Sequence, residues 1–228
     1  MGDLTRQDML DMAATAYEHA ISTIYAMDGI FKKVTGADYD SALTIAQFDT
    51  ILQGVLLSVA CADGNFDPLE QEFIRAFTTH GDLLDFIRGD SDGQVDLTWE
   101  EVADLPQELK DKLIEILPGI LDDQCRSFIV PLTTVDVSYS KYGNVETTPG
   151  DFLKSIEQDM IKIAGSLAFV DLEGTDDEMS AGVKMIFELG AFIPLPFADE
   201  IVDTFRPVTL SLFAHLFVKH RAVMTAQQ

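Results

Sequence analysis

Apolar residues recur every three or four positions along most of this chain, which is the spacing of amphipathic helices. One such face predicts a long first helix and comprises Met9, Met12, Ala16, Ala20, Ile24, Met27 and Phe31. A second face of the same kind comprises Ile45, Phe48, Leu52, Val55 and Val59. Three more helical patterns fall near 151–170, 175–190 and 199–222. Strand patterns are weak, and only Val135 to Val145 predicts a short strand, so the sequence predicts an all-α fold.

Two tetrapeptides in the middle of the chain carry the signature of a helix start. In Asp67-Pro68-Leu69-Glu70 and in Thr98-Trp99-Glu100-Glu101, a capping residue is followed three positions later by Glu, which is the pattern of a capping box. From 107 to about 137 a further helical pattern contains Pro118 and Pro131. We expect this helix to be kinked or divided at the prolines, because proline removes a backbone donor and clashes with the preceding turn.

The sequence also contains an internal repeat, because a shift of 108 residues superimposes the second helix on the one that begins at Asp151. The aligned apolar pairs are Ile45 with Leu153, Phe48 with Ile156, Leu52 with Met160, Val55 with Ile163, Val59 with Leu167 and Ala60 with Ala168. Beyond the helix ends, Asp63 coincides with Asp171 and Glu70 with Glu178. We therefore expect two helix–turn–helix units and an insert within one helical domain. Their bounds are about 43–80, 151–190 and 81–150, within a domain spanning 1–228.

Composition narrows the range of partners. The 228 residues include 39 acidic and 15 basic side chains, which gives a formal charge of −24, and 47% of the residues are hydrophobic, as in folded proteins. So large a negative charge repels phosphate backbones and anionic lipid, so we expect no nucleic-acid partner and no membrane insertion. Divalent cations and basic protein surfaces are the matching partners. The first residues do not resemble a secretory signal, and Cys61 and Cys125 lie in apolar runs, which favours a cytoplasmic location with reduced thiols.

Acidic residues gather at the two predicted turns. Each unit places an Asp at the end of one helix and a Glu seven positions later, and these pairs are Asp63 with Glu70 and Asp171 with Glu178. Two such turns related by approximate symmetry would gather four carboxylates, with Asp67 close by. Their mutual repulsion requires a neutralising cation, and hard cations prefer carboxylate and carbonyl oxygens. The candidate metal ligands are therefore these five residues, and the candidate ions are calcium, magnesium and manganese.

Helix capping is a second explanation of the same residues. Glu70 and Glu178 follow the good N-cap residues Asp67 and Thr175 by three positions. A Glu in that position satisfies backbone N–H groups and suits the positive end of the helix dipole without any metal. The residues alone leave capping and metal binding both open.

The segment LLSVACADGNFDPLEQEFI resembles the first signature of the tellurite-resistance TerB-like family, in which a helix ends in Ala-Asp-Gly and Glu follows seven residues after the Asp. The segment AGSLAFVDLEGTDDEMSAGV is similar to the family's second copy, although it reads Val170-Asp171-Leu172 at the helix end. The resemblance covers roughly 40–80 and 150–190. It implies a duplicated all-helical fold and a role in stress-response or tellurite-resistance systems. It also implies an acidic, metal-binding surface formed by Asp63, Glu70, Asp171 and Glu178.

These observations lead to a functional expectation with two alternatives. We expect a non-enzymatic protein that binds a divalent cation through the carboxylates of the paired turns. Other metal or catalytic motifs are not indicated, since the sequence contains no Glu-x-x-His pair of a di-iron bundle, no HExxH zinc helix and no complete EF-hand loop. The first alternative is a metal-free acidic interaction module, which docks a basic protein partner and has an apolar groove in its Phe-rich C-terminal third. The second alternative is a hydrolase that activates water on a carboxylate-bound metal.

Overall fold

The computed structural model of the chain describes residues 5–62, 64–77, 79–89, 98–142 and 151–170, together with 178 and 181. Over these residues the chain forms helices and no strand, which confirms the all-α fold. The helices of this described part are α1 (Arg6–Thr35), α2 (Ser41–Ala60), α3 (Pro68–Arg75), α4 (Leu83–Gly89), α5 (Trp99–Ala103), α6 (Gln107–Ile120), α7 (Asp122–Tyr142) and α8 (Asp151–Leu167).

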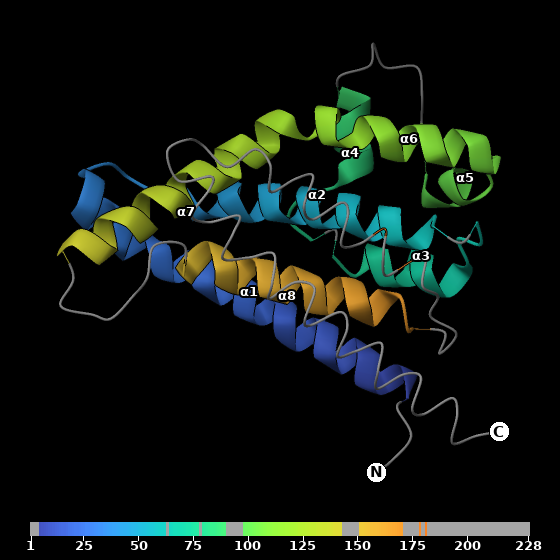
Figure 1. The fold of residues 1–228 in the computed structure, drawn as a ribbon, viewed down its shortest axis with the longest axis horizontal. Coiled ribbons are helices and arrows are strands. Elements are labelled where there is room, and N and C mark those ends of the chain that lie inside the picture. Colours follow the sequence, from blue (N-terminus) through green and yellow to red (C-terminus); the bar gives the residue numbers. More distant parts are fainter. Residues whose placement is uncertain are drawn as a thin grey trace.

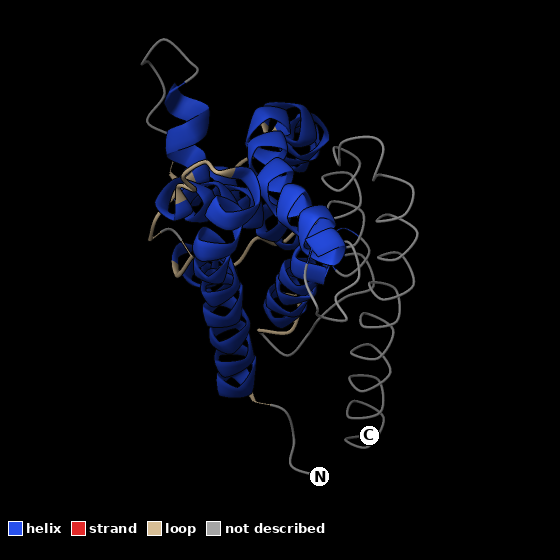
Figure 2. Ribbon diagram, turned by 90° about the vertical axis from the view of Figure 1, so that its left-hand side faces the viewer, coloured by secondary structure: helices blue, strands red, loops and turns tan. Residues whose placement is uncertain are grey.

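Four long helices, α1, α2, α7 and α8, pack against one another around a shared core (Figure 1). α1 and α8 lie side by side and share the most extensive contact between any two helices, while α7 contacts all three of the others. α2 and α8 run in the same direction and α1 runs in the opposite direction (Figure 1). The shorter helices α3, α4 and α6 pack along α2. Figure 2 shows the same helical arrangement turned by 90°.

α1 confirms the first predicted helix and shows how its ends are fixed. Its buried residues are Met9, Ala13, Ala16, Ala20, Ile24 and Met27. Thr5 caps the N-terminus in a reciprocal capping box with Asp8. At the other end Gly36 adopts a φ of 75°, which a glycine reaches without the steric cost of a side chain, and its N–H donates to the Lys32 carbonyl oxygen.

α2 lies at the centre of the molecule and is buried on all sides. Between Thr44 and Ala60 every residue except Ala46 is buried. By length and composition this helix could also cross a membrane, with a mean hydropathy of 1.4, but 83% of its apolar window is buried inside the structure. Its apolar surface is therefore already covered by the protein's own helices.

Polar groups inside α2 hold the neighbouring loop in place. The Gln53 side-chain amide donates to the carbonyl oxygens of Phe77 and Gly81, at 2.9 and 2.7 Å, and its Oε1 accepts from the Leu83 N–H at 2.8 Å. A single buried side chain thus satisfies three backbone groups in the connection between α3 and α4. Buried backbone groups need such hydrogen-bond partners.

The region from 107 to 142 differs from the sequence prediction in two ways. The predicted helix is divided, as expected, but the break falls at Leu121, whereas Pro118 and Pro131 lie inside α6 and α7. The short strand predicted between Val135 and Val145 is wrong for 135–142, which continue α7 to Tyr142. Packing of α7 against α1, α2 and α8 outweighs the local preference of β-branched residues for strands.

The remaining expectations have different outcomes. α4 is a helix that the sequence pattern did not predict. The aligned apolar residues of α2 and α8 are all buried, as a repeat requires, but the duplication itself stays a prediction. The helices expected near 175–190 and 199–222 lie outside the described residues, apart from helical residues 178 and 181.

Candidate functional site

The first predicted turn is a well-capped connection between α2 and α3. Asp67 is the N-cap of α3, and its Oδ1 accepts from the backbone N–H groups of Leu69 and Glu70 at 2.7 and 2.9 Å. The Glu70 carboxylate accepts from the Asp67 N–H at 2.9 Å, which completes the capping box. Pro68 occupies the first turn, where no backbone donor is needed. The capping interpretation of Asp67 and Glu70 is therefore confirmed.

The same turn is held against the rest of the protein on both sides. Gly64 has a φ of 88°, in the left-handed region that favours glycine. The Gln107 side-chain amide donates to the Cys61 carbonyl oxygen at 3.0 Å, at the C-terminal end of α2. Phe66 is buried and meets Trp99 of α5 edge to face, with ring centroids 6.4 Å apart. These contacts hold the described part of the turn against α5 and α6.

Of the acidic residues predicted at the second turn, the structure describes Glu178. Glu178 is helical and 5% exposed, close to the 4% of its sequence equivalent Glu70. Asp63, Asp171 and Thr175 lie outside the described residues. Within the described ranges no group of three or more His, Cys, Asp or Glu side chains could hold a metal ion. Of the five candidate ligands, Asp67, Glu70 and Glu178 lie among the described residues, and the capping box joins Asp67 to Glu70. The metal site itself stays a prediction.

No protein-family model, no curated protein and no solved structure matches this chain. We therefore infer its function from the geometry of its own residues.

A buried aspartate in the middle of α2 joins three segments of the chain. The Tyr17 hydroxyl on α1 donates to Asp49 Oδ1 at 2.7 Å, and the His80 backbone N–H donates to Asp49 Oδ2 at 3.0 Å. His80 Nδ1 lies 3.3 Å from the same Oδ2 and 3.2 Å from the Tyr17 hydroxyl. Burial raises the pKa of the Asp49 carboxyl, although its hydrogen bonds oppose the shift. Burial beside Asp49 also raises the pKa of Tyr17.

A second buried aspartate links α1 to α8. Asp159 is 1% exposed, and its Oδ2 lies 2.5 Å from Nδ1 of His19, which is largely exposed. The Lys162 ammonium donates to Asp159 Oδ1 at 2.9 Å, so both carboxylate oxygens have a partner. The two Asp–His pairs share one design, in which a buried carboxylate holds an imidazole that reaches the surface.

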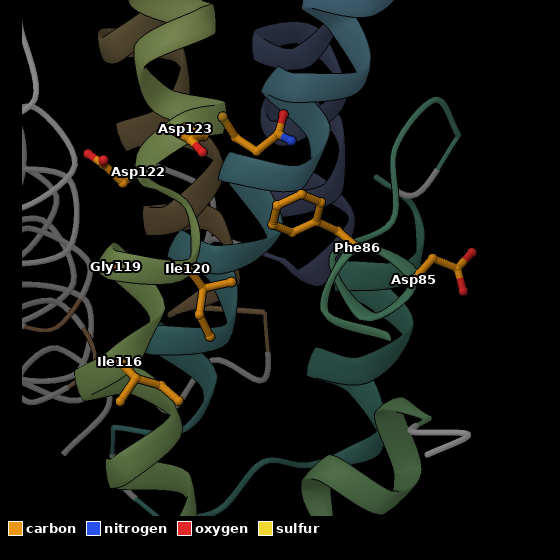
Figure 3. A pocket seen from close by; sticks show the side chains of 8 residues that line it. Asp85, Phe86, Ile116, Gly119, Ile120, Asp122 and Asp123 are labelled. Atoms are coloured by element: carbon orange, nitrogen blue, oxygen red, sulfur yellow. The ribbon is translucent and has the colours of Figure 1, made fainter. Parts of the chain in front are cut away.

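A groove lies between α4 and the junction of α6 and α7, with a volume of about 710 Å³. Phe86 projects from α4 toward this junction, and Ile116 and Ile120 lie along α6 (Figure 3). The Asp85 and Asp122 carboxylates point to opposite outer sides in the same view (Figure 3). Among the residues that the structure describes, the groove is lined by Asp85, Phe86, Ile116, Gly119, Ile120, Asp122, Asp123 and Gln124.

Sequence reasoning did not find the Asp–His pairs or this groove. The pairs span 31 and 140 residues, so no local spacing links their members. One signal was present, because Asp49 follows Ile45 by one helical turn and Asp159 follows Ile156 by nearly one turn. An ionisable side chain at a core position of a helix indicates a buried partner, since unpaired buried charges are costly.

Proposed function

We propose that the protein binds a divalent cation, without catalysing a reaction, through carboxylates that follow α2 and α8. The observation that carries the proposal is the common direction of these helices, whose C-terminal ends lie at the same end of the bundle (Figure 1). The acidic segments that follow them also carry the buried, register-equivalent glutamates Glu70 and Glu178. A chain of charge −24 also attracts cations.

The ligands of the proposed site divide into two roles. Asp63, Glu70, Asp171 and Glu178 would supply oxygen ligands to calcium, magnesium or manganese. Asp67 would act mainly as support, because its Oδ1 caps α3. A role in a stress or tellurite-resistance system rests on the TerB-like resemblance of the two turn segments.

Thermal unfolding at constant ionic strength tests this proposal. A ligand that binds only the folded state at 100 times its Kd adds roughly 2.7 kcal/mol of stability, so Ca²⁺, Mg²⁺ or Mn²⁺ should raise the Tm. The gain should vanish in the double variant Asp63→Asn/Asp171→Asn. It should persist in the control variant Asp28→Asn/Asp38→Asn. This variant also removes two negative charges, but from exposed positions in the C-terminal part of α1 and just after its end. An equal response of both double variants, or an equal gain with sodium chloride, would mean that salt only screens the net charge.

Glu70→Gln separates capping from metal binding. A glutamine keeps an acceptor for the Asp67 N–H but removes the charge that a hard cation requires. If Glu70 only caps α3, the variant melts like the wild type and both respond equally to metal. If Glu70 is a ligand, the metal-dependent gain in Tm is lost while the Tm without metal changes little.

A further inference from the structure

The groove between α4 and the α6–α7 junction contains two isoleucines that are not part of the core, whereas its Phe86 packs partly against the core. α6 buries one stripe, which includes Leu117 and continues into Leu121, both fully buried. Ile116 and Ile120 form a second stripe beside it, since residues four apart lie one above the other on a helix. Ile116 is 55% exposed, and Ile120 is half-buried. This second stripe therefore presents an apolar surface to the groove instead of to the core.

The shape of the groove suits an elongated occupant. Phe86 faces the α6–α7 junction from α4, so apolar groups line both sides (Figure 3). Between Ile116 and Ile120, Gly119 carries no side chain, and a Cβ placed there would meet nothing within 4 Å. The groove thus follows α6 for at least one turn, with open space where a larger residue would stand.

The charged side chains in the described lining of the groove are acidic. They are Asp85, Asp122 and Asp123, and none of the lining residues that the structure describes is Lys or Arg. On the next turn of α7, Arg126 Nε contacts both Asp122 carboxylate oxygens at 2.9 Å, which partly offsets that charge. The field of a chain with charge −24 adds to the local acidity.

Helix dipoles explain part of this arrangement. Asp85 lies in the first turn of α4, and Asp122 and Asp123 lie in the first turn of α7, where negative charge is stabilising. The dipole gives no reason for an exposed isoleucine stripe beside these carboxylates. Apolar side chains on α4 and α6 with carboxylates around them are instead the complement of an amphipathic basic helix, which lays its apolar face in a groove and its cations on the rim.

We propose that this groove docks a short basic amphipathic helix of a partner protein, with its apolar face on Ile116, Ile120 and Phe86 and its Lys or Arg residues near the surrounding aspartates. This surface is distinct from the turns after α2 and α8, so the proposal does not depend on cation binding. It also differs from the groove predicted in the Phe-rich C-terminal third, whose residues from Phe187 to Phe217 lie outside the described residues. Because the groove is small, the interaction should be a transient one.

Fluorescence anisotropy with the full-length chain tests the docking. The probe is a fluorescein-labelled helical peptide built only of Leu and Lys, with Leu at helical spacing, and the comparison peptide has the same composition in scrambled order. At about 0.15 M salt, where long-range attraction is screened, the amphipathic peptide should bind at least about tenfold more tightly than the scrambled one. Equal binding of the two peptides would overturn the proposal, because net charge alone would then account for it.

Matched variants locate the binding surface. Ile116→Ser should weaken binding of the amphipathic peptide by about tenfold, on the scale of a few buried methylene groups. Leu43→Ser, at a residue of similar exposure (54%) near the start of α2, should leave it unchanged. Both positions are exposed, so both variants should keep the wild-type helical circular dichroism. Equal weakening by the two variants, or none by Ile116→Ser, would overturn the proposal.

Charge variants and a small cation complete the test. Asp85→Asn/Asp123→Asn should weaken binding and reduce its salt dependence more than Asp28→Asn/Asp38→Asn, which removes two charges elsewhere. Spermine, an organic cation without an apolar face, should not displace the peptide at concentrations similar to that of the unlabelled peptide. Displacement at similar concentrations would show that the groove takes small cations, and would overturn the assignment of a protein helix.

Discussion

His19 on α1 and Asp159 on α8 are joined across the most extensive helix contact of the molecule, with 2.5 Å between Nδ1 and Oδ2. The carboxylate is buried, and the imidazole reaches solvent. Lys162 contacts the other carboxylate oxygen, so Asp159 ties together two positions on α8 and one on α1. This polar link lies alongside the buried apolar residues that α1 and α8 contribute to the core.

Asp159→Ala should reduce the free energy of unfolding by about 1–3 kcal/mol, because it removes a buried acceptor and both of its hydrogen bonds. The comparison variant is Asp38→Ala, which removes an exposed partner of Lys32. Exposed ion pairs contribute about 0–1 kcal/mol, so this variant should be close to the wild type. Urea unfolding of the two variants measures the difference. Equal losses would mean that the link between α1 and α8 contributes no more than a surface pair.

The raised pKa of Asp49 predicts a pH-dependent contribution to stability. Burial makes the folded protein hold the Asp49 proton more tightly than the unfolded chain does. The stabilisation is therefore complete below the ordinary pKa of aspartate, about 3.9, and is lost as the pH rises through the folded-state pKa. Asp49→Asn removes this titration. The difference in unfolding free energy between wild type and variant should therefore decrease as the pH is raised from about 4.

Urea unfolding of both proteins over a series of pH values measures this trend. Tyr17→Phe serves as a comparison, because it removes the hydroxyl that donates to Asp49 but leaves the carboxyl in place. A difference between wild type and Asp49→Asn that grows with pH would show that the contacts with His80 and Tyr17 outweigh burial.

The periodicity of apolar residues was sufficient to predict three of the long helices. α1, α2 and α8 were expected because their apolar residues follow a 3.6-residue period, and the starts of α3 and α5 because Asp67 and Thr98 are followed by a Glu in a capping box. These features depend only on nearby residues.

Tertiary contacts decided the features that the sequence did not reveal. Leu121, where the predicted helix breaks, is fully buried, and a Cβ placed at Gly54 of α2 would lie 2.7 Å from its side chain. α4 begins at Leu83, whose N–H donates a hydrogen bond to Oε1 of Gln53, 30 residues earlier in the chain. The partners of Asp49 and Asp159 likewise lie on other helices or loops, so no local pattern could identify them.

Both cysteines should be unreactive in the folded protein. Cys61 and Cys125 are buried free thiols. Burial, with a smaller effect of the nearby Asp122, raises the pKa of Cys125 to about 12. Since the thiolate is the reactive form, titration with Ellman's reagent at about pH 8 should detect neither thiol in the native protein and both in guanidinium chloride. Cys125→Ser should leave one thiol in the unfolded state, and rapid reaction of native Cys125 would contradict its burial.

Gly81 should be intolerant of any side chain, because α2 passes directly beside it. A Cβ at this position would lie 2.2 Å from the Ala46 carbonyl oxygen and 2.8 Å from Thr50 Oγ1. Moving the loop to relieve this clash would strain the hydrogen bond from Gln53 to the Gly81 carbonyl oxygen. We expect Gly81→Ala to destabilise the protein by about 1–3 kcal/mol, as overpacking does.

Gly29 provides the matched control for this substitution. It lies inside α1, and a Cβ there would meet nothing within 4 Å. Gly29→Ala should therefore stabilise the protein by about 0.5–1 kcal/mol, because alanine loses less backbone freedom in a helix. Urea unfolding should thus give opposite signs for the same chemical change at the two positions. A neutral Gly81→Ala variant would mean that the loop between α3 and α4 can move away from α2 at little cost.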